Sequence, residues 1–132
     1  MKRAVAGLII VAGALIGGVP AYAHHSFAAT YFEDKSVTIE GNVVEFDFRN
    51  PHSLLTLEVP DDGTGQGKAT MWLAEWRSAG RLLNDGVSKD TLHPGDHVIV
   101  SGSPGHAAAE HKIHLKKINR PADGFHWDQG KR

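Results

Sequence analysis

The chain of 132 residues contains no cysteine. It therefore has no disulfide framework, no thiolate metal site and no cysteine nucleophile. A strong excess of charge is also lacking, because 14 basic residues stand against 15 acidic ones and give a net charge of −1. This balance gives no electrostatic reason to expect a nucleic-acid partner.

One long apolar run is present, and it predicts a secretory signal peptide over residues 1–23. Lys2 and Arg3 precede an uncharged apolar stretch, and Pro20 leads into the small-x-small sequence "AYA" that signal peptidase accepts. The alternative is an uncleaved anchor, but four glycines interrupt a run that is short for the roughly 20 apolar residues of a spanning helix. We expect cleavage after Ala23, no stable membrane span afterwards, and a periplasmic or secreted protein.

Removal of residues 1–23 from the 132 leaves 109 residues, which is enough for one small domain with its own core. The loss of Lys2 and Arg3 leaves 12 basic and 15 acidic residues and a net charge of −3. All nine histidines lie in this part of the chain. The sequence predicts a domain over 24–120 and a loosely ordered tail over 121–132, where no periodic pattern is present.

Alternation of apolar residues predicts five strands, and a short helix is predicted between the third and the fourth. The apolar phase of the first strand slips near Val43, which predicts a β-bulge there. Ser78 can cap the helix and Gly86 can end it. The strands are expected at 37–48, 53–59, 69–76, through Val98 and Val100, and at 111–118, and the helix at 78–86.

This order of elements predicts an all-β fold, a five-stranded OB-like Greek-key barrel in which the helix covers one end. A five-stranded sandwich or an SH3-like barrel is the alternative. The expected core consists of Val37, Ile39, Val43, Phe46, Leu55, Leu57, Val59, Leu73, Val98, Val100, Ile113 and Leu115.

Four motifs, "AHHSFAATY", "FRNPH", "WLAEW" and "LHPGDHVIVSGSP", with the spacing between them, resemble a family of small exported bacterial proteins of unknown function. The resemblance covers the chain from His24 to about Arg120. It implies an OB-like barrel and an exported location. It implies no reaction, substrate or catalytic residue.

Cleavage after Ala23 would leave His24 and His25 at the start of the processed chain. A terminal histidine offers its α-amine and its imidazole Nδ1 to one metal ion, and nitrogen ligands favour copper among the divalent metals. A frayed terminus without function is the alternative. His52 is the best third ligand because it follows Asn-Pro in a turn, although a turn histidine bonded to nearby backbone is the simpler interpretation. The candidate metal ligands are therefore His24, His25 and His52, and the candidate cofactor is copper.

The remaining polar residues carry no diagnostic spacing. On a strand His111 and His114 face opposite sides, so we interpret them as surface or cross-strand residues. Glu75 lies on an otherwise apolar strand face, either at the barrel mouth or paired with Arg49 or Arg77. The other histidines are weak secondary candidates at His93, His97, His106 and His126.

Three functions remain open. The first is a periplasmic protein whose partner is a metal ion, and the second is a non-catalytic module that binds a peptide, a glycan or an envelope protein. The third, a copper redox enzyme, is disfavoured because 109 residues leave little room for a substrate cleft. No paired-carboxylate, Ser-His-Asp or phosphate-loop motif is present, so we expect no enzyme activity.

We predict that the exported protein begins at His24. Intact-mass analysis of periplasmic material should give the mass of residues 24–132. A mass that retains Met1, or that starts elsewhere, would remove the terminal histidine on which the metal hypothesis depends.

Overall fold

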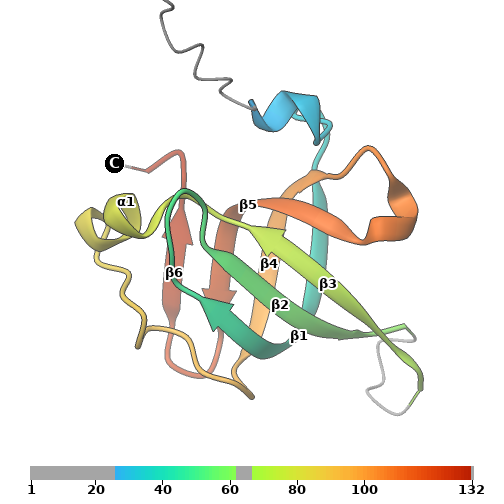
Figure 1. Cartoon of the computed structure of the whole chain (residues 1–132). Coiled ribbons are helices and arrows are strands. Elements are labelled where there is room, and N and C mark those ends of the chain that lie inside the picture. Colours follow the sequence, from blue (N-terminus) through green and yellow to red (C-terminus); the bar gives the residue numbers. More distant parts are fainter. Residues whose placement is uncertain (1–25, 62–66, 132) are drawn as a thin grey trace, which may run out of the picture.

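The alternating apolar residues of the sequence form six strands in the computed structural model, which describes residues 26–61 and 67–131 (Figure 1). The predicted signal peptide, His24 and His25 lie outside the described residues. The strands are β1 Val37–Asp47, β2 Leu54–Pro60, β3 Ala69–Glu75, β4 His97–Pro104, β5 Lys112–Arg120 and β6 Phe125–Asp128, and the helices are the 3-10 turns η1 Phe27–Ala29 and η2 Ala108–Glu110 and the α-helix α1 Ala79–Asn84.

The first five strands close into a barrel. The sheet order is β3-β2-β1-β4-β5-β6, and an additional parallel pairing of β3 with β5 joins the two ends of the five-stranded part. All other neighbouring strands are antiparallel. The prediction of an all-β, five-stranded barrel with a short helix between the third and fourth strands is confirmed.

The long first strand bends around the barrel, as its phase slip predicts. Val43 pairs with Leu57 and Glu45 with Thr56, so Val44 is the extra residue of a bulge in β1. Gly41 lies opposite β2, and a Cβ at this position would collide with the carbonyl of Glu58. The lack of a side chain therefore lets the two backbones approach where β1 curves.

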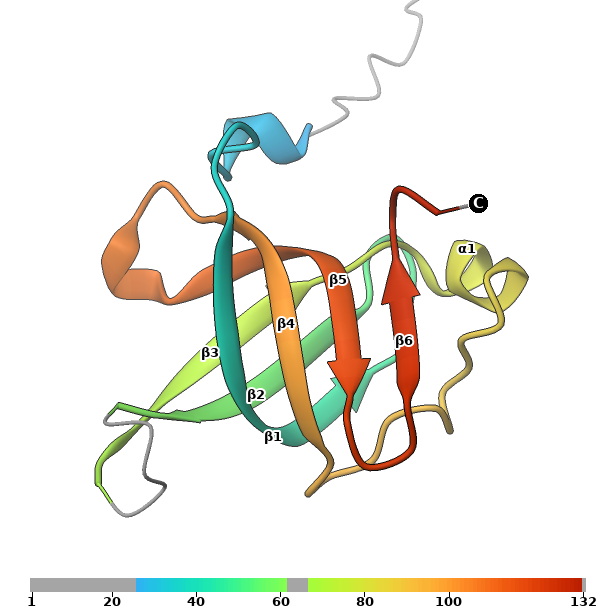
Figure 2. The ribbon, with the colours of Figure 1, turned by 180° about the vertical axis from the view of Figure 1, so that it is seen from behind.

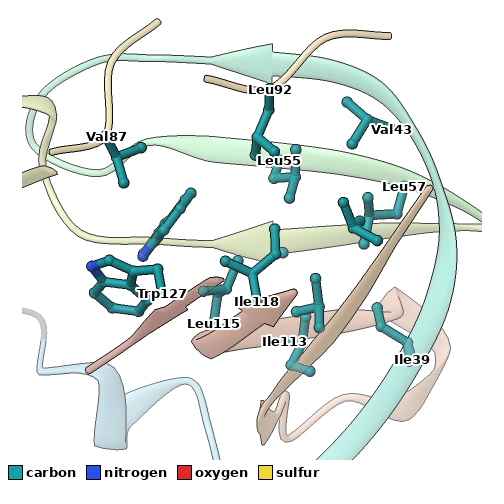
Figure 3. Packing of buried hydrophobic residues seen from close by; sticks show 14 of the residues in the cluster. Ile39, Val43, Leu55, Leu57, Val87, Leu92, Ile113, Leu115, Ile118 and Trp127 are labelled. Atoms are coloured by element: carbon teal, nitrogen blue, oxygen red, sulfur yellow. The ribbon is translucent and has the colours of Figure 1, made fainter. Parts of the chain in front are cut away.

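The barrel interior holds the core, and Figure 3 shows its side chains meeting between the strands. Most of the predicted core residues are buried there or pack against it. The prediction of Leu73 as a core residue is wrong, because the side chains of β3 that reach the core cluster are Trp72 and Ala74. Since β3 is apolar on both faces, alternation alone did not identify the inner one.

The helix α1 begins and ends as its caps predict. The Ser78 side chain accepts a hydrogen bond from the Arg81 amide, and Gly86 adopts a positive φ of 82° after the last turn. Leu82, Val87 and Leu92 from α1 and the segment after it join the core cluster, so this connection covers part of the barrel interior.

The expectation of a loosely ordered tail is wrong for Phe125–Asp128, which form β6 on the outer edge of β5. Trp127 is 8% exposed and its ring packs edge-on against Trp76, with 5.0 Å between centroids. Its indole N–H donates to Asp85. The last element therefore belongs to the folded domain.

Figures 1 and 2 place η1, α1 and the C-terminal end of β6 toward the same end of the barrel, together with the turn between β1 and β2. The C-terminal end of β2 and the start of β3 lie at the opposite end. Within the two described ranges, no helix has the length and apolar character needed to cross a membrane.

Leu57→Ala should lower the free energy of unfolding by about 2–5 kcal/mol, because the Leu57 side chain is fully buried and its removal leaves a cavity. Leu83→Ala is the matched control, since Leu83 is 57% exposed, and should change it by less than about 0.5 kcal/mol. Urea titration of both variants measures the difference. Equal values would contradict the observed register of β2.

Candidate functional site

The segment before β1 is fastened across the seam where β3 meets β5. Tyr31 forms an isolated antiparallel bridge with Gly105, and the Phe32 amide donates to the Pro104 carbonyl at 2.9 Å. The His106 amide donates to the Thr30 carbonyl at 2.8 Å. These bonds fix η1 and Tyr31 against the outside of the barrel.

The turn between β1 and β2 is equally well fixed. The Ser53 amide donates to the Arg77 carbonyl at 3.2 Å, and the Trp76 amide donates to the Ser53 carbonyl at 2.9 Å. The Ser53 hydroxyl, which is buried, bonds both the amide and the carbonyl of Arg49. These bonds give the His52 backbone a firm support between the turn and the end of β3.

His52, Glu75 and Tyr31 form one hydrogen-bonded group. One Glu75 carboxylate oxygen accepts from His52 Nδ1 at 2.5 Å and the other from the Tyr31 hydroxyl at 2.6 Å. Burial and the hydrogen bond to the Glu75 carboxylate raise the pKa of Tyr31, so the phenol stays protonated and remains a donor. The carboxylate selects the His52 tautomer with hydrogen on Nδ1, which leaves the lone pair on Nε2.

A second carboxylate–histidine pair lies on the other side of η1. His114 Nδ1 is 2.8 Å from Glu33 Oε1, and Lys116 Nζ is 3.1 Å from Glu33 Oε2. Burial lowers the pKa of His114, and the Glu33 carboxylate only partly offsets this. Burial alone would raise the pKa of Glu33, but the hydrogen bonds from His114 and Lys116 outweigh it and the pKa is lowered. Glu33 is therefore ionised and His114 neutral near pH 7.

Phe27 lies between the two histidine rings. Its ring stacks on His114 with 3.6 Å between centroids and an angle of 4°, and on His52 with 4.7 Å and 27°. Both imidazoles are held by a carboxylate at Nδ1, so the phenyl ring contacts two rings of fixed orientation. Phe27 thus attaches the start of the described chain directly to His52.

Two hollows flank the Phe27 ring. The larger, which we call the His52 cleft, has a volume of about 530 Å³ and is lined by residues 26–27, 51–52 and 77–78 and by Arg81. A smaller one of about 220 Å³ lies on the His114 side, with Trp76 and Trp127 in its wall. Phe27, Arg77 and Arg81 border both hollows, so the aromatic ring separates them.

Of the three predicted metal ligands, the structure places His52 alone, because His24 and His25 lie outside the described residues. Among residues 26–61 and 67–131, no group of three or more histidine, aspartate and glutamate side chains could hold a metal ion. A metal at His52 would therefore need donors from before Ser26. None of the remaining histidines, His93, His97, His106, His111 and His126, lines the His52 cleft. His97 bonds Glu40 and Asn42, and His111 packs on Trp72.

Two sequence-based interpretations of this region each named two alternatives, and one alternative of each is wrong. Glu75 pairs with neither Arg49 nor Arg77, which bind Asp47 and Asp85 instead; its partners are His52 and Tyr31. His114 is not a surface residue, because it is 5% exposed, but it does lie across from neighbouring strands, opposite Glu75 and Ser103.

The alternation of apolar and polar residues in β5 did not indicate that His114 is buried. Its outward face is covered by η1 and Tyr31, which precede the first strand, and not by a neighbouring strand. For Glu75 a signal was present, since a carboxylate on an apolar face requires a partner. The sequence could not choose histidine over arginine for that role.

A family model described as a family of unknown function (DUF6152) matches residues 13–114. The matched segment contains every residue of the His52–Glu75–Tyr31 group and of the His114–Glu33 pair. No curated protein matches the chain.

The low pKa of buried His114 should make the protein less stable as the pH falls from about 7.5 to 5. Below its ordinary pKa of 6.5 the imidazole of His114 takes up a proton in the unfolded chain but resists protonation in the folded one. The free energy of unfolding therefore decreases with falling pH. In His114→Gln this dependence should be weaker, as measured by urea titration at each pH.

His126→Gln is the matched control, because His126 is exposed and should keep the wild-type dependence. If His114→Gln and wild type lose stability in parallel, His114 does not carry the effect. Glu33 acts in the same direction but at lower pH, below its ordinary value of 4.5, so it does not interfere with the comparison.

Proposed function

The chain belongs to the DUF6152 family of unknown function, and from that premise we propose that it is an exported protein that binds copper through His24, His25 and His52. Export follows from the signal-like sequence of residues 1–23. The observation that carries the metal proposal is the stacking of Phe27 on His52.

Phe27 brings the start of the chain within reach of the His52 imidazole. Phe27 lies three positions after His24 in the sequence, and a chain extends by at most about 3.3–3.6 Å per residue. The backbone of His24 can therefore lie no further than roughly 10 Å from the backbone of Phe27, whose ring contacts His52. This short reach supports the proposal of a shared ion, because it requires no rearrangement of the barrel.

The hydrogen bond between His52 and Glu75 supports a role of His52 as a ligand. Histidines that bind metals usually donate their second ring N–H to a carboxylate or carbonyl group, which fixes the tautomer and raises the basicity of the ligating nitrogen. In this protein Nδ1 donates to Glu75, so Nε2 is the nitrogen available for a metal. The side chain is 33% exposed and borders an open cleft, so an ion can approach it.

His24 would be the principal ligand. Its α-amine and its imidazole Nδ1 belong to one residue, so little ordering entropy opposes their joint coordination of one ion. His52 supplies a third nitrogen from a fixed turn, and His25 can approach from the opposite side if the terminus bends. Amine and imidazole nitrogens favour Cu(II) over the other divalent first-row metals, and no thiolate competes because the chain has no cysteine.

Copper affinity should depend on the position of the terminal amine. We expect a protein that begins at His24 to bind Cu(II) at least about tenfold more tightly than one with a glycine added before His24. The extended chain keeps both imidazoles and a free amine but moves that amine to the glycine. Isothermal titration gives the affinities, and electron paramagnetic resonance gives the number of coordinated nitrogens.

His52→Ala should weaken copper binding by about the same factor and remove one nitrogen from the spectrum. His126→Ala is the control. It deletes an exposed imidazole near the C-terminal end of the sequence and should leave the copper affinity unchanged. Equal affinities in all four proteins would mean that copper binds adventitiously. The non-catalytic module that binds a peptide, a glycan or an envelope protein would then be the better interpretation.

A further inference from the structure

The His52 cleft has a local charge opposite to that of the chain. Arg77, Arg81 and His52 line it, and no acidic residue does. The whole chain carries a net charge of −1, so the positive lining is not a consequence of composition. From this juxtaposition we propose that the His52 cleft binds an organic carboxylate, with Arg81 as the residue that pairs with its anionic group. This site is independent of bound copper.

Among the arginines of the cleft, Arg81 is the one whose charge is not compensated by an ion pair within the described residues. Arg77 donates to Asp85 at 2.9 Å and lies over the Trp127 ring, so its charge is compensated within the fold. None of the ion pairs of the described residues includes Arg81, which is exposed on α1. A guanidinium group presents two parallel N–H donors that match the two oxygens of a carboxylate.

The remainder of the lining defines the rest of the ligand. Phe27 and Pro51 give the cleft an apolar wall, and Ser26 and Ser78 add hydroxyl groups at its border. A volume of about 530 Å³ lies in the range of sites for small organic molecules and far exceeds the size of an inorganic anion. A compound with a carboxylate at one end and a flat apolar body fits both parts, because the body can contact Pro51 and the free edge of the Phe27 ring while the anionic end reaches Arg81.

The position of His52 adds a further constraint. Its imidazole lies in the same lining as the arginines, while its Nδ1 is bound to Glu75. The Glu75 carboxylate is engaged by His52 and Tyr31, so it is not turned toward the cleft as a competing anion. The charged groups that line the cleft are therefore the guanidinium groups of Arg77 and Arg81, with no carboxylate among the lining residues.

Benzoate is a suitable probe, and benzamide is its neutral counterpart of nearly equal shape. The processed protein from the periplasm, freed of metal on a chelating resin, is titrated with each compound while amide chemical shifts are recorded by NMR. Benzoate should move the signals of Phe27, His52, Ser78 and Arg81 and should bind at least fivefold more tightly than benzamide. Arg81→Gln should weaken benzoate binding on the order of fivefold.

Lys89→Gln is the matched control, because it also removes one positive charge. Lys89 is exposed, as Arg81 is, but lies outside the cleft. It should change benzoate affinity by less than about twofold. The proposal is overturned if benzoate does not bind, if benzamide binds as well, or if Arg81→Gln and Lys89→Gln have the same effect. Because no copper is present, these outcomes are separate from the copper titration, and either proposal can fail while the other stands.

Discussion

The parallel pairing of β3 with β5 is the constraint on which the remaining structure depends. It closes the barrel, and its register places Glu75 directly opposite His114. The inner face of this seam gives Ala74, Ile113 and Leu115 to the core. Its outer face carries two polar side chains in a position where any covering segment must satisfy them. Barrel closure and the candidate site are therefore products of the same strand pairing.

The segment that covers the seam meets this requirement with two carboxylate–histidine pairs. Tyr31 completes the hydrogen bonds of Glu75, and Glu33 supplies the acceptor for His114. Phe27 fills the space between the two imidazoles with an apolar ring. Gly102 assists from β4, because a side chain there would collide with the His114 carbonyl. The two carboxylate–histidine pairs can be partly buried here because each histidine and each carboxylate has a hydrogen-bond partner.

The sequence predicts those elements whose pattern is local. The bulge near Val43, the helix caps and the five barrel strands follow from spacing within a few residues, and all are confirmed. The strand β6 was missed because four residues after a glycine turn are too few to show alternation, and its stability comes from contacts of Trp127 with Trp76 and Asp85. Such long-range contacts leave no periodic signal.

The candidate site shows the same division. His52 could be selected from its Asn-Pro turn, but its partnership with Glu75 spans 23 residues and that of Tyr31 with Glu75 spans 44. Net charge does not describe local charge, because a chain with a net charge of −1 can hold a cleft lined by Arg77 and Arg81. Composition constrains the whole surface, whereas a binding site depends on which few charges the fold brings together.

A copper site built on the amine of His24 would exist only after the signal peptide is removed. Before cleavage that nitrogen is part of a peptide bond, which has no basic lone pair for a metal. The barrel, with His52 held by Glu75 and Phe27 seated beside it, would already present the fixed part of the site. Cleavage would then add the missing donor in the compartment to which the protein is delivered. In this proposed arrangement export itself would limit metal binding to the processed protein, and the fold would need no conformational switch to enforce it.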